Sequence, residues 1–313
     1  MVFWLLALKV ITLLAVVVLL YKKLKDPTNF GSGFWYEISL LSTNVSSIAF
    51  LSLSIILMPL NWFMEALKWK FLVQKQHVIS NRSAFEGVLT GLSLGFVTPH
   101  AVGDYVGRLI QLPVDNKTQL IGSVWLGKVV QMIVTALFGL IGVIAFFRTV
   151  NFQINTFLIG LALLTLFSSA IVGFIFLKST YSGWIARFQG YFKIVLSYSS
   201  SELLKILGLA ISRYLIFSIQ FVLILFAFKV PLAFLELFSG VTWILLLKSI
   251  IPSFNFMSDL GIRELSTITF FDQFDIDQIP VVSASLILWL INILIPMLIG
   301  LVLFIKLKLP QAK

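Results

Sequence analysis

Long apolar segments, separated by short polar links, follow one another along most of the chain. A helix of about 20 apolar residues is long enough to cross the hydrocarbon core of a bilayer. The pattern therefore predicts an all-α, polytopic integral membrane protein with eight hydrophobic segments, six of them uninterrupted. We expect these six to be transmembrane helices, over Val2–Leu20, Ile38–Lys68, Gln119–Phe147, Gln153–Leu177, Leu203–Phe228 and Ile279–Ile305.

The segment Ala84–Leu112 begins like a membrane helix but is interrupted. Pro99 breaks it, Gly103 follows the break, and Asp104 and Arg108 stand at the i, i+4 spacing of a helix. A proline inside a helix removes a hydrogen bond and costs about 3 kcal/mol. Neither half has enough apolar residues to span a bilayer. We expect a re-entrant hairpin, two half-helices that enter the membrane and turn back.

The segment Leu232–Phe274 repeats the proline, aspartate and arginine in the same order. We expect Pro252 and Gly261 to break it, and Asp259 and Arg263 are again four residues apart. We expect a second re-entrant hairpin, entering from the opposite side of the membrane. Two broken helices that meet near the bilayer centre in inverted orientation are typical of secondary transporters.

The link Lys178–Glu202 is too polar to span. Its large apolar side chains, among them Trp184, Phe188 and Tyr191, recur at helical spacing, and its charges fall elsewhere on the helical wheel. This pattern predicts a helix that lies in the membrane surface.

Composition supports a membrane protein. Of the 313 residues, 59% are hydrophobic and 12% are charged, and the mean hydropathy is +1.03, whereas soluble domains carry about 25% charged residues. No long polar stretch suggests a separate soluble unit, so we expect a single transmembrane domain over residues 1–313. There is no cysteine, which excludes disulfides and thiolate chemistry.

The net charge of +10 does not indicate a nucleic-acid partner, because most cations stand at the ends of predicted spans. With six spans both termini share a face, and that face collects most of the lysines and arginines. The positive-inside rule therefore predicts cytoplasmic termini, although Lys22, Lys23 and Lys25 oppose it. The first segment lacks a basic start and a cleavage site, so we expect a retained helix and no signal peptide.

Five cations lie inside predicted membrane segments. A charge at the bilayer centre costs roughly 2.5–3.5 kcal/mol on the most lenient scale, so five would cost about 12–18 kcal/mol if all faced lipid. They must pair with carboxylates, reach the surface or line an aqueous cavity. These residues are Arg108, Lys128, Arg213, Lys248 and Arg263.

Cations at span ends need less explanation. Lys68, Lys178, Lys205, Lys229 and Lys306 can extend their ammonium groups to the membrane surface. Lys128 is nine residues into its span, about 13 Å along a helix, too far for this.

The two Asp–Arg pairs have two interpretations. Each is explained equally well as an ion pair that stabilises its own half-helix. In the other interpretation, half-helix N-termini at the hairpin tips add unpaired N–H groups and a positive dipole to the buried cations. Such a site would bind the phosphate of a lipid headgroup, which arginine contacts in bidentate geometry.

Other chemistry is weakly supported. His77 and His100 are scattered and have no cysteine or carboxylate at ligand spacing, so we expect no metal site. The sequence contains no glycine-rich phosphate loop and no nucleophile–base pattern, and we expect no cofactor and no catalytic residues. The acidic link with Asp272, Asp275 and Asp277 is typical of a solvated loop.

An ordered set of motifs resembles a known family. The motifs are Asn61…Glu65…Lys68-Trp69, Thr98-Pro99…Gly103-Asp104…Gly107-Arg108, Arg213-Tyr214…Gln220 and Lys248-Ser-Ile-Ile-Pro252…Asp259-Leu-Gly-Ile-Arg263. With this set the chain resembles the transmembrane, flippase-like domain of lysylphosphatidylglycerol synthases and related stand-alone membrane proteins.

This resemblance implies a bacterial inner-membrane protein that translocates a lipid, in the full-length synthases an aminoacylated phosphatidylglycerol. It implies that five residues have functional roles: Asp104, Arg108, Arg213, Asp259 and Arg263. The soluble aminoacyltransferase domain has no counterpart here, so the resemblance implies transport and not synthesis. Where the family motif is expected to carry Glu, this chain has Gly127-Lys128, which adds a cation to the expected cavity.

We therefore expect a lipid flippase that binds an anionic or aminoacylated phospholipid headgroup in a basic intramembrane cavity. The alternative is a membrane enzyme, or an enzyme subunit, that acts on polyprenyl-linked sugars, and it would need the acidic link of Asp272, Asp275 and Asp277. A third hypothesis is a structural partner of a lipid-modifying enzyme, which a stable co-purifying protein would favour.

Overall fold

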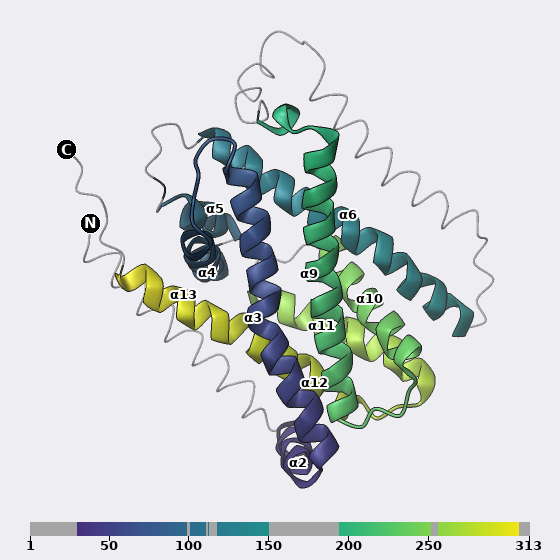
Figure 1. Cartoon of the computed structure of the whole chain (residues 1–313). Helices are drawn as coiled ribbons and strands as arrows, with labels where there is room; N and C mark the ends of the chain where they lie inside the picture. Colours follow the sequence, from purple (N-terminus) through teal and green to yellow (C-terminus); the bar gives the residue numbers. More distant parts are fainter. Residues whose placement is uncertain are drawn as a thin grey trace.

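The computed structural model describes residues 30–98, 101–110, 112, 118–149, 194–251 and 256–306. Across these residues the chain is helical and forms no strand, as the sequence predicts (Figure 1). Short helical turns occupy Val195–Ser197, Asp272–Phe274 and Leu290–Leu294. The long elements are α2 (Phe30–Thr43), α3 (Val45–Val73), α4 (Asn81–Val97), α5 (Val102–Leu109), α6 (Thr118–Thr149), α9 (Ser200–Ala227), α10 (Phe234–Ile250), α11 (Phe256–Phe271), α12 (Gln278–Trp289) and α13 (Ile295–Lys306).

In the described part, four helical stretches are long and apolar enough to cross a membrane. They are Val45–Val73, Leu120–Arg148, Ser200–Ala227 and Gln278–Lys306. Each matches a predicted span, the first with both of its boundaries shifted toward the C-terminus. The predicted spans Val2–Leu20 and Gln153–Leu177 lie outside the described residues. So do residues 178–193, which form most of the predicted surface helix. The protein is thus a multi-pass membrane protein.

Two predicted boundaries were wrong. The expected single helix Ile38–Lys68 is divided at Asn44, whose side chain accepts a hydrogen bond from the Ser46 N–H and so caps α3. The predicted surface helix does not continue to Glu202, because Ser199 is the N-cap of α9 and forms a capping box with Glu202. In both places a short polar side chain satisfies a free N–H group and begins a new helix.

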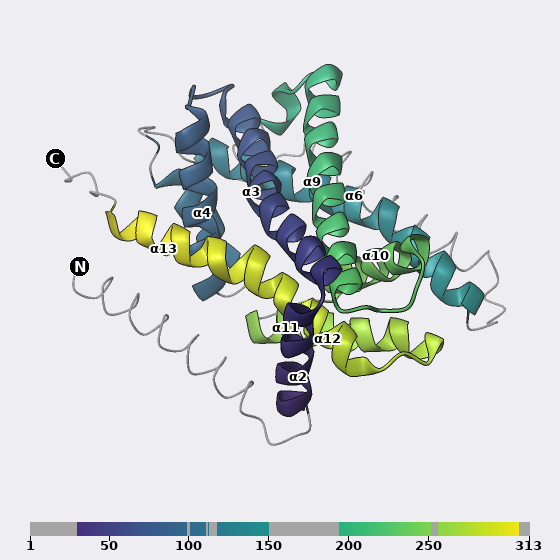
Figure 2. The same cartoon turned by 60° about the horizontal axis from the view of Figure 1, so that its bottom comes forward.

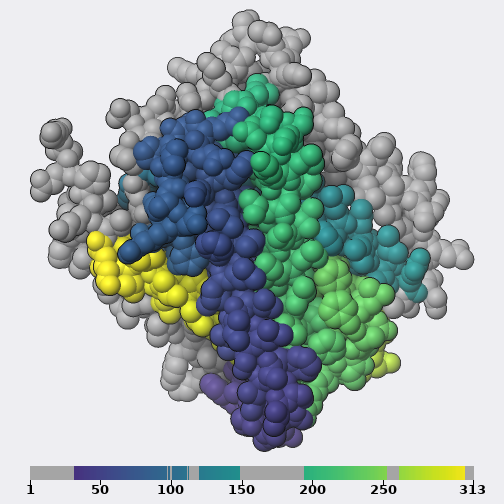
Figure 3. Space-filling model, in the orientation of Figure 1, coloured from purple at the N-terminus to yellow at the C-terminus, as the bar shows by residue number. Residues whose placement is uncertain are grey.

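The helices α3 and α9 form the centre of the described fold and run side by side (Figures 1 and 2). The space-filling view shows both helices on one face, with α4 and α5 beside the upper part of α3 (Figure 3). Buried polar groups join them: Gln220 Nε2 donates to the Ser54 carbonyl at 2.8 Å. A buried amide bonded in this way fixes the register of two otherwise apolar helices.

The helices α4 and α5 pack against each other as an antiparallel hairpin. A Cβ on Gly103 would lie 2.2 Å from the Leu94 carbonyl oxygen, and one on Gly107 would lie 2.5 Å from the Gly91 Cα atom. Only glycine allows two backbones to approach this closely. The hydroxyl of Thr98 accepts a hydrogen bond from the Gly103 N–H and caps α5.

A second helix pair, α10 and α11, follows the same plan with looser packing. A Cβ on Gly240 would meet the Phe270 and Phe271 rings at 2.8–2.9 Å. The break falls after Ile250, as predicted, and Pro252 lies outside the described residues. Gly261, expected at the break, instead lies inside α11, which begins at Phe256. A helix tolerates an interior glycine at a cost of roughly 0.5–1 kcal/mol, so it does not end there.

The last predicted span contains a π-helical turn, Leu290–Leu294, between α12 and α13. Pro296 has no N–H to offer the carbonyl of Asn292 four residues earlier. The indole Nε1 of Trp62 donates to that carbonyl at 3.0 Å instead. Asn61 Nδ2 also contacts the Asn292 side-chain oxygen, at 3.4 Å. The irregular turn is thus held by α3.

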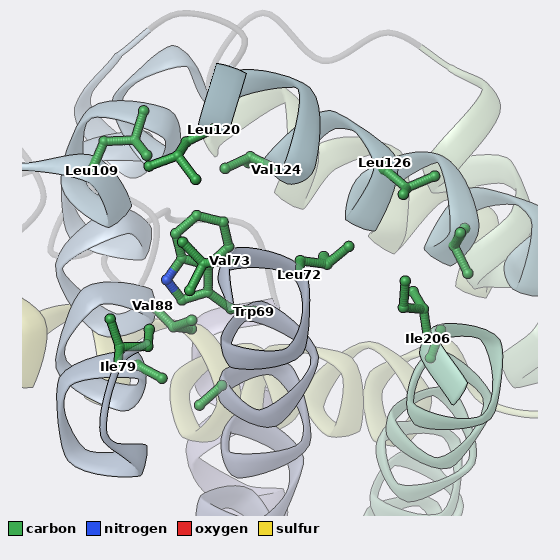
Figure 4. Close-up of a cluster of buried hydrophobic side chains, with 14 of the residues drawn as sticks. Trp69, Leu72, Val73, Ile79, Val88, Leu109, Leu120, Val124, Leu126 and Ile206 are labelled. Carbon is green, nitrogen blue, oxygen red and sulfur yellow. The ribbon is translucent and has the colours of Figure 1, made fainter. Parts of the chain in front are cut away.

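Among the described residues, one apolar cluster lies where α3, α4, α5, α6 and α9 meet. Figure 4 shows the Trp69 ring at its centre, with Val88 and Leu109 on the hairpin side and Leu120 and Val124 above it. Trp69 is 1% exposed. This cluster joins the first hairpin to α3 and α6 and thereby positions the charged side chains described next.

Candidate functional site

A cavity of about 620 Å³ lies among α3, α4, α5, α6, α9, the end of α10 and the π-helical turn region. Thr98 and Ala101 line it from the tip of the first hairpin, and Lys248 and Ser249 line it from the end of α10 beside the second break. The volume is typical of a small-molecule site, which measures about 300–1,000 Å³. Both hairpins therefore contribute to one cavity.

Glu65 of α3 is a carboxylate at this cavity that forms ion pairs with cations from three helices. Its Oε1 lies 3.0 Å from a guanidinium nitrogen of Arg108, and its Oε2 lies 2.7 Å from Lys68 Nζ and 3.2 Å from Arg213. These cations come from α5, α3 and α9. Because an unpaired charge in this environment is costly, the network requires all three helices to stay in place.

Asp104 is the second carboxylate. It accepts from Arg108 Nε at 2.7 Å, and its other oxygen lies 3.0 Å from Lys128 Nζ. Arg108 thus bridges Asp104 and Glu65, and both of its carboxylate partners are buried. The expected i, i+4 pair of the first hairpin is present, and it also connects α5 to α6 through Lys128.

One neutral side chain, that of Gln131, also belongs to the network. Gln131 of α6 accepts from Lys68 Nζ at 3.1 Å and from Arg213 at 3.4 Å, and it donates to the Ala210 carbonyl at 3.3 Å. The Ala210 carbonyl therefore sets the orientation of the Gln131 amide, and the amide oxygen faces the two cations.

An aromatic ring stands beside each of three cations. Arg213 lies 5.3 Å from the centre of Trp62, Arg108 lies 5.8 Å from Trp69, and Lys128 lies 4.4 Å from Tyr105. A cation over an aromatic face gains about 0.5–2 kcal/mol, most where water is excluded. The rings fix the cations in position without neutralising them.

The structure brings together most of the residues expected in the site. Asp104, Arg108, Lys128, Arg213 and Lys248 all line the cavity. Arg263 is 2% exposed and is not among the lining residues. The side chain of Asp259 lies outside the described part of the chain, as does Pro99.

One expectation about the lysines was wrong. Lys68 was predicted to reach the membrane surface from the end of its span, yet it is 2% exposed and paired with Glu65. The helix continues to Val73, so Lys68 lies inside it. Glu65, noted in the sequence only as part of a motif, pairs with three cations and is central to the network. A single carboxylate in a long apolar segment is the signal that identifies such a residue.

Gln131 and Trp62 were missed, because an amide or an indole in a membrane helix has no distinctive pattern in sequence. The acidic residues of the alternative hypothesis lie elsewhere. Asp277 caps α12 by accepting from the Ile279 N–H, and Asp272 accepts from Gln278 at 3.4 Å. Neither lines the cavity.

The family described as Lysylphosphatidylglycerol synthase TM region matches the chain over residues 4–300. The chain belongs to this family. Membership, which the ordered motifs predicted, relates the protein to membrane proteins of lipid metabolism. The match covers nearly the whole sequence, including both hairpins and the residues of the charged network. The chain matches no curated protein and no solved structure.

Proposed function

We propose that this protein is a lipid flippase, which binds the polar headgroup of a phospholipid in the cavity and moves it between leaflets. The supporting observation is the cation-lined cavity between two helix hairpins in a multi-pass membrane protein. In this proposal the two hairpins are re-entrant and form an inverted repeat, both termini are cytoplasmic, and the membrane is a bacterial inner membrane.

The energetic requirement is the passage of a charged headgroup through hydrocarbon. One charge at the bilayer centre costs roughly 2.5–3.5 kcal/mol or more. A cation about 4 Å from a phosphate contributes about 4 kcal/mol where the effective dielectric constant is near 20. Since about 1.4 kcal/mol changes a rate tenfold, two or three such contacts would accelerate lipid movement by several orders of magnitude.

The arrangement also supports a route for access. Hairpin tips, broken helices and a π-helical turn border the same cavity, and π-turns often mark functional positions in helices. Rocking of one hairpin against α3 and α9 would open the cavity to one leaflet at a time, as in other inverted-repeat carriers. The acyl chains would stay in the bilayer during this movement.

Reconstitution into liposomes tests the proposal. Phospholipids with a fluorescent acyl chain are placed in both leaflets, and a membrane-impermeant quencher reports how fast inner-leaflet lipid reaches the outside. We expect the wild type to accelerate this exchange over protein-free liposomes. Arg213→Gln, which removes a cavity cation from α9, is expected to slow exchange at least about tenfold.

The matched control is Lys205→Gln, which removes the same charge from an exposed position on the same helix. It is expected to leave exchange unchanged. Equal rates for the wild type, Arg213→Gln and protein-free liposomes would refute transport by this cavity.

A further inference from the structure

The charges that line the cavity are unbalanced. Among the described side chains, two lining residues are carboxylates, Glu65 and Asp104. Four cations pair with these two carboxylates, which leaves an excess of two positive charges within this network. The cations are Lys68, Arg108, Lys128 and Arg213.

The two carboxylates have no oxygen left for a ligand that carries positive charge. Both oxygens of Glu65 face cations at 2.7–3.2 Å, and both oxygens of Asp104 do so at 2.7–3.0 Å. A ligand ammonium group would have to displace a lysine or an arginine from a buried ion pair. Breaking such a pair is strongly unfavourable.

The cations, by contrast, are the groups that the cavity presents. The Lys128 side chain is 38% exposed and the Arg213 side chain is 23% exposed, whereas those of Glu65 and Asp104 are 8% and 12% exposed. A lysine ammonium has three donors, and only one contact of Lys128, to Asp104, involves a carboxylate. A ligand phosphate would therefore meet positive charge first.

From this asymmetry we infer the substrate class, an inference that rests on the proposed function. We propose that the cavity selects headgroups with net negative charge, bound through their phosphate, and excludes aminoacylated headgroups. A lysylated phosphatidylglycerol has one phosphate charge against two ammonium groups, so its headgroup is net positive. Lys128 is the residue that determines this selectivity.

Lys128 is suited to that role by position. It reaches the cavity from α6, pairs with the hairpin residue Asp104 and lies over the Tyr105 ring. Lys128→Glu would lower the lining charge by two and set a carboxylate beside Asp104. A ligand ammonium would then find an acceptor that the wild type lacks.

The experiment compares three fluorescent lipids in proteoliposomes: phosphatidylglycerol, phosphatidylcholine and lysyl-phosphatidylglycerol. We expect the wild type to move phosphatidylglycerol at least about tenfold faster than lysyl-phosphatidylglycerol, because like charges in a desolvated site repel strongly. Phosphatidylcholine should fall between them. Lys128→Glu is expected to reverse the order of the two charged lipids, and Lys128→Arg to preserve it.

Wild-type movement of lysyl-phosphatidylglycerol at an equal or higher rate would overturn the inference while leaving transport intact. If no lipid moves faster than in protein-free liposomes, transport fails, and the binding arm decides the substrate class. In that arm, purified protein is offered an equimolar mixture of the three lipids, and the retained lipid is read by mass spectrometry. Retention of phosphatidylglycerol supports the inference, and equal or preferential retention of the lysylated lipid overturns it.

Glycerophosphoglycerol distinguishes a lipid site from a site for a soluble phosphate. It carries the same phosphodiester headgroup but no acyl chains, so it should compete poorly with phosphatidylglycerol in the binding arm. Competition at equal concentration would assign the site to a soluble phosphate ester and overturn the lipid assignment. Lys205→Gln serves as the control in every arm and is expected to keep the wild-type preference.

Discussion

The α4–α5 hairpin and the α10–α11 hairpin each carry a proline followed by an aspartate and an arginine four residues apart, yet they meet the cavity differently. The first places its aspartate and its arginine in the cavity wall, where Arg108 also pairs with Glu65 of α3. The second contributes Lys248 and Ser249 from the end of α10, while Arg263 is buried away from the lining. Equal spacing in sequence therefore does not give equal roles, because the surrounding helices decide what each arginine faces.

The packing of the two hairpins differs as well. In the first, glycine brings the two backbones into direct contact, whereas Gly240 of the second packs against phenylalanine rings. Backbone contact holds Asp104 and Arg108 in a fixed place, which a charged network with short distances requires. The comparison leads to four predictions, from the largest expected effect to the smallest.

Arg108→Ala should have the largest effect. It removes a cation shared by Glu65 and Asp104, and breaking a buried ion pair costs about 3–5 kcal/mol. Unfolding of the detergent-solubilised protein, followed by heating, should show this loss, and lipid exchange per folded molecule should fall more than about tenfold. Arg263→Ala is also expected to destabilise the fold but to keep exchange within about twofold. An equal loss of exchange in both variants would show that the hairpins are functionally equivalent.

A pair of glycine substitutions tests the packing difference. Gly107→Ala would place a Cβ 2.5 Å from the Gly91 backbone, and such overpacking costs roughly 1–3 kcal/mol. Gly261→Ala meets no described atom within 4 Å, and it should stabilise α11 by up to about 1 kcal/mol. The unfolding temperatures of the two variants should therefore move in opposite directions. A shift of the same sign in both would contradict the proposed difference.

Thr98→Val tests the tip of the first hairpin. The variant keeps the side-chain shape but loses the oxygen that accepts from the Gly103 N–H, and losing such a cap costs about 1 kcal/mol. Hydrogen exchange at the start of α5 should become faster. Thr98→Ser, which retains the hydroxyl, is the control and should exchange like the wild type.

Lys248→Gln should have the smallest effect. The residue lines the cavity from α10, and a partly solvated charge contributes about 0.2–1 kcal/mol. Exchange of phosphatidylglycerol should slow by up to about fivefold, less than in Arg213→Gln. A larger loss than in Arg213→Gln would make the second hairpin the principal headgroup site.

Local rules predicted the broken helices correctly. Proline cannot continue a helix and glycine allows close backbone approach, so residues near Pro99 and Gly103 indicated a hairpin before any tertiary contact was known. The break before Pro252 followed from the same rule. Asn44 and Ser199 were overlooked as caps because each stands among other short polar residues and between segments whose apolar spacing suggested continuous helix.

The sequence by itself determined that this is a helical membrane protein with two interrupted segments and more buried cations than carboxylates. Hydropathy, proline and charge are properties of single residues and near neighbours, and each can be judged from local spacing. Only the tertiary structure decided that Glu65 pairs with Arg108 and Arg213, that Lys68 is buried, and that Arg263 is not in the cavity wall. Those outcomes depend on which helix faces which, and long-range packing sets that arrangement.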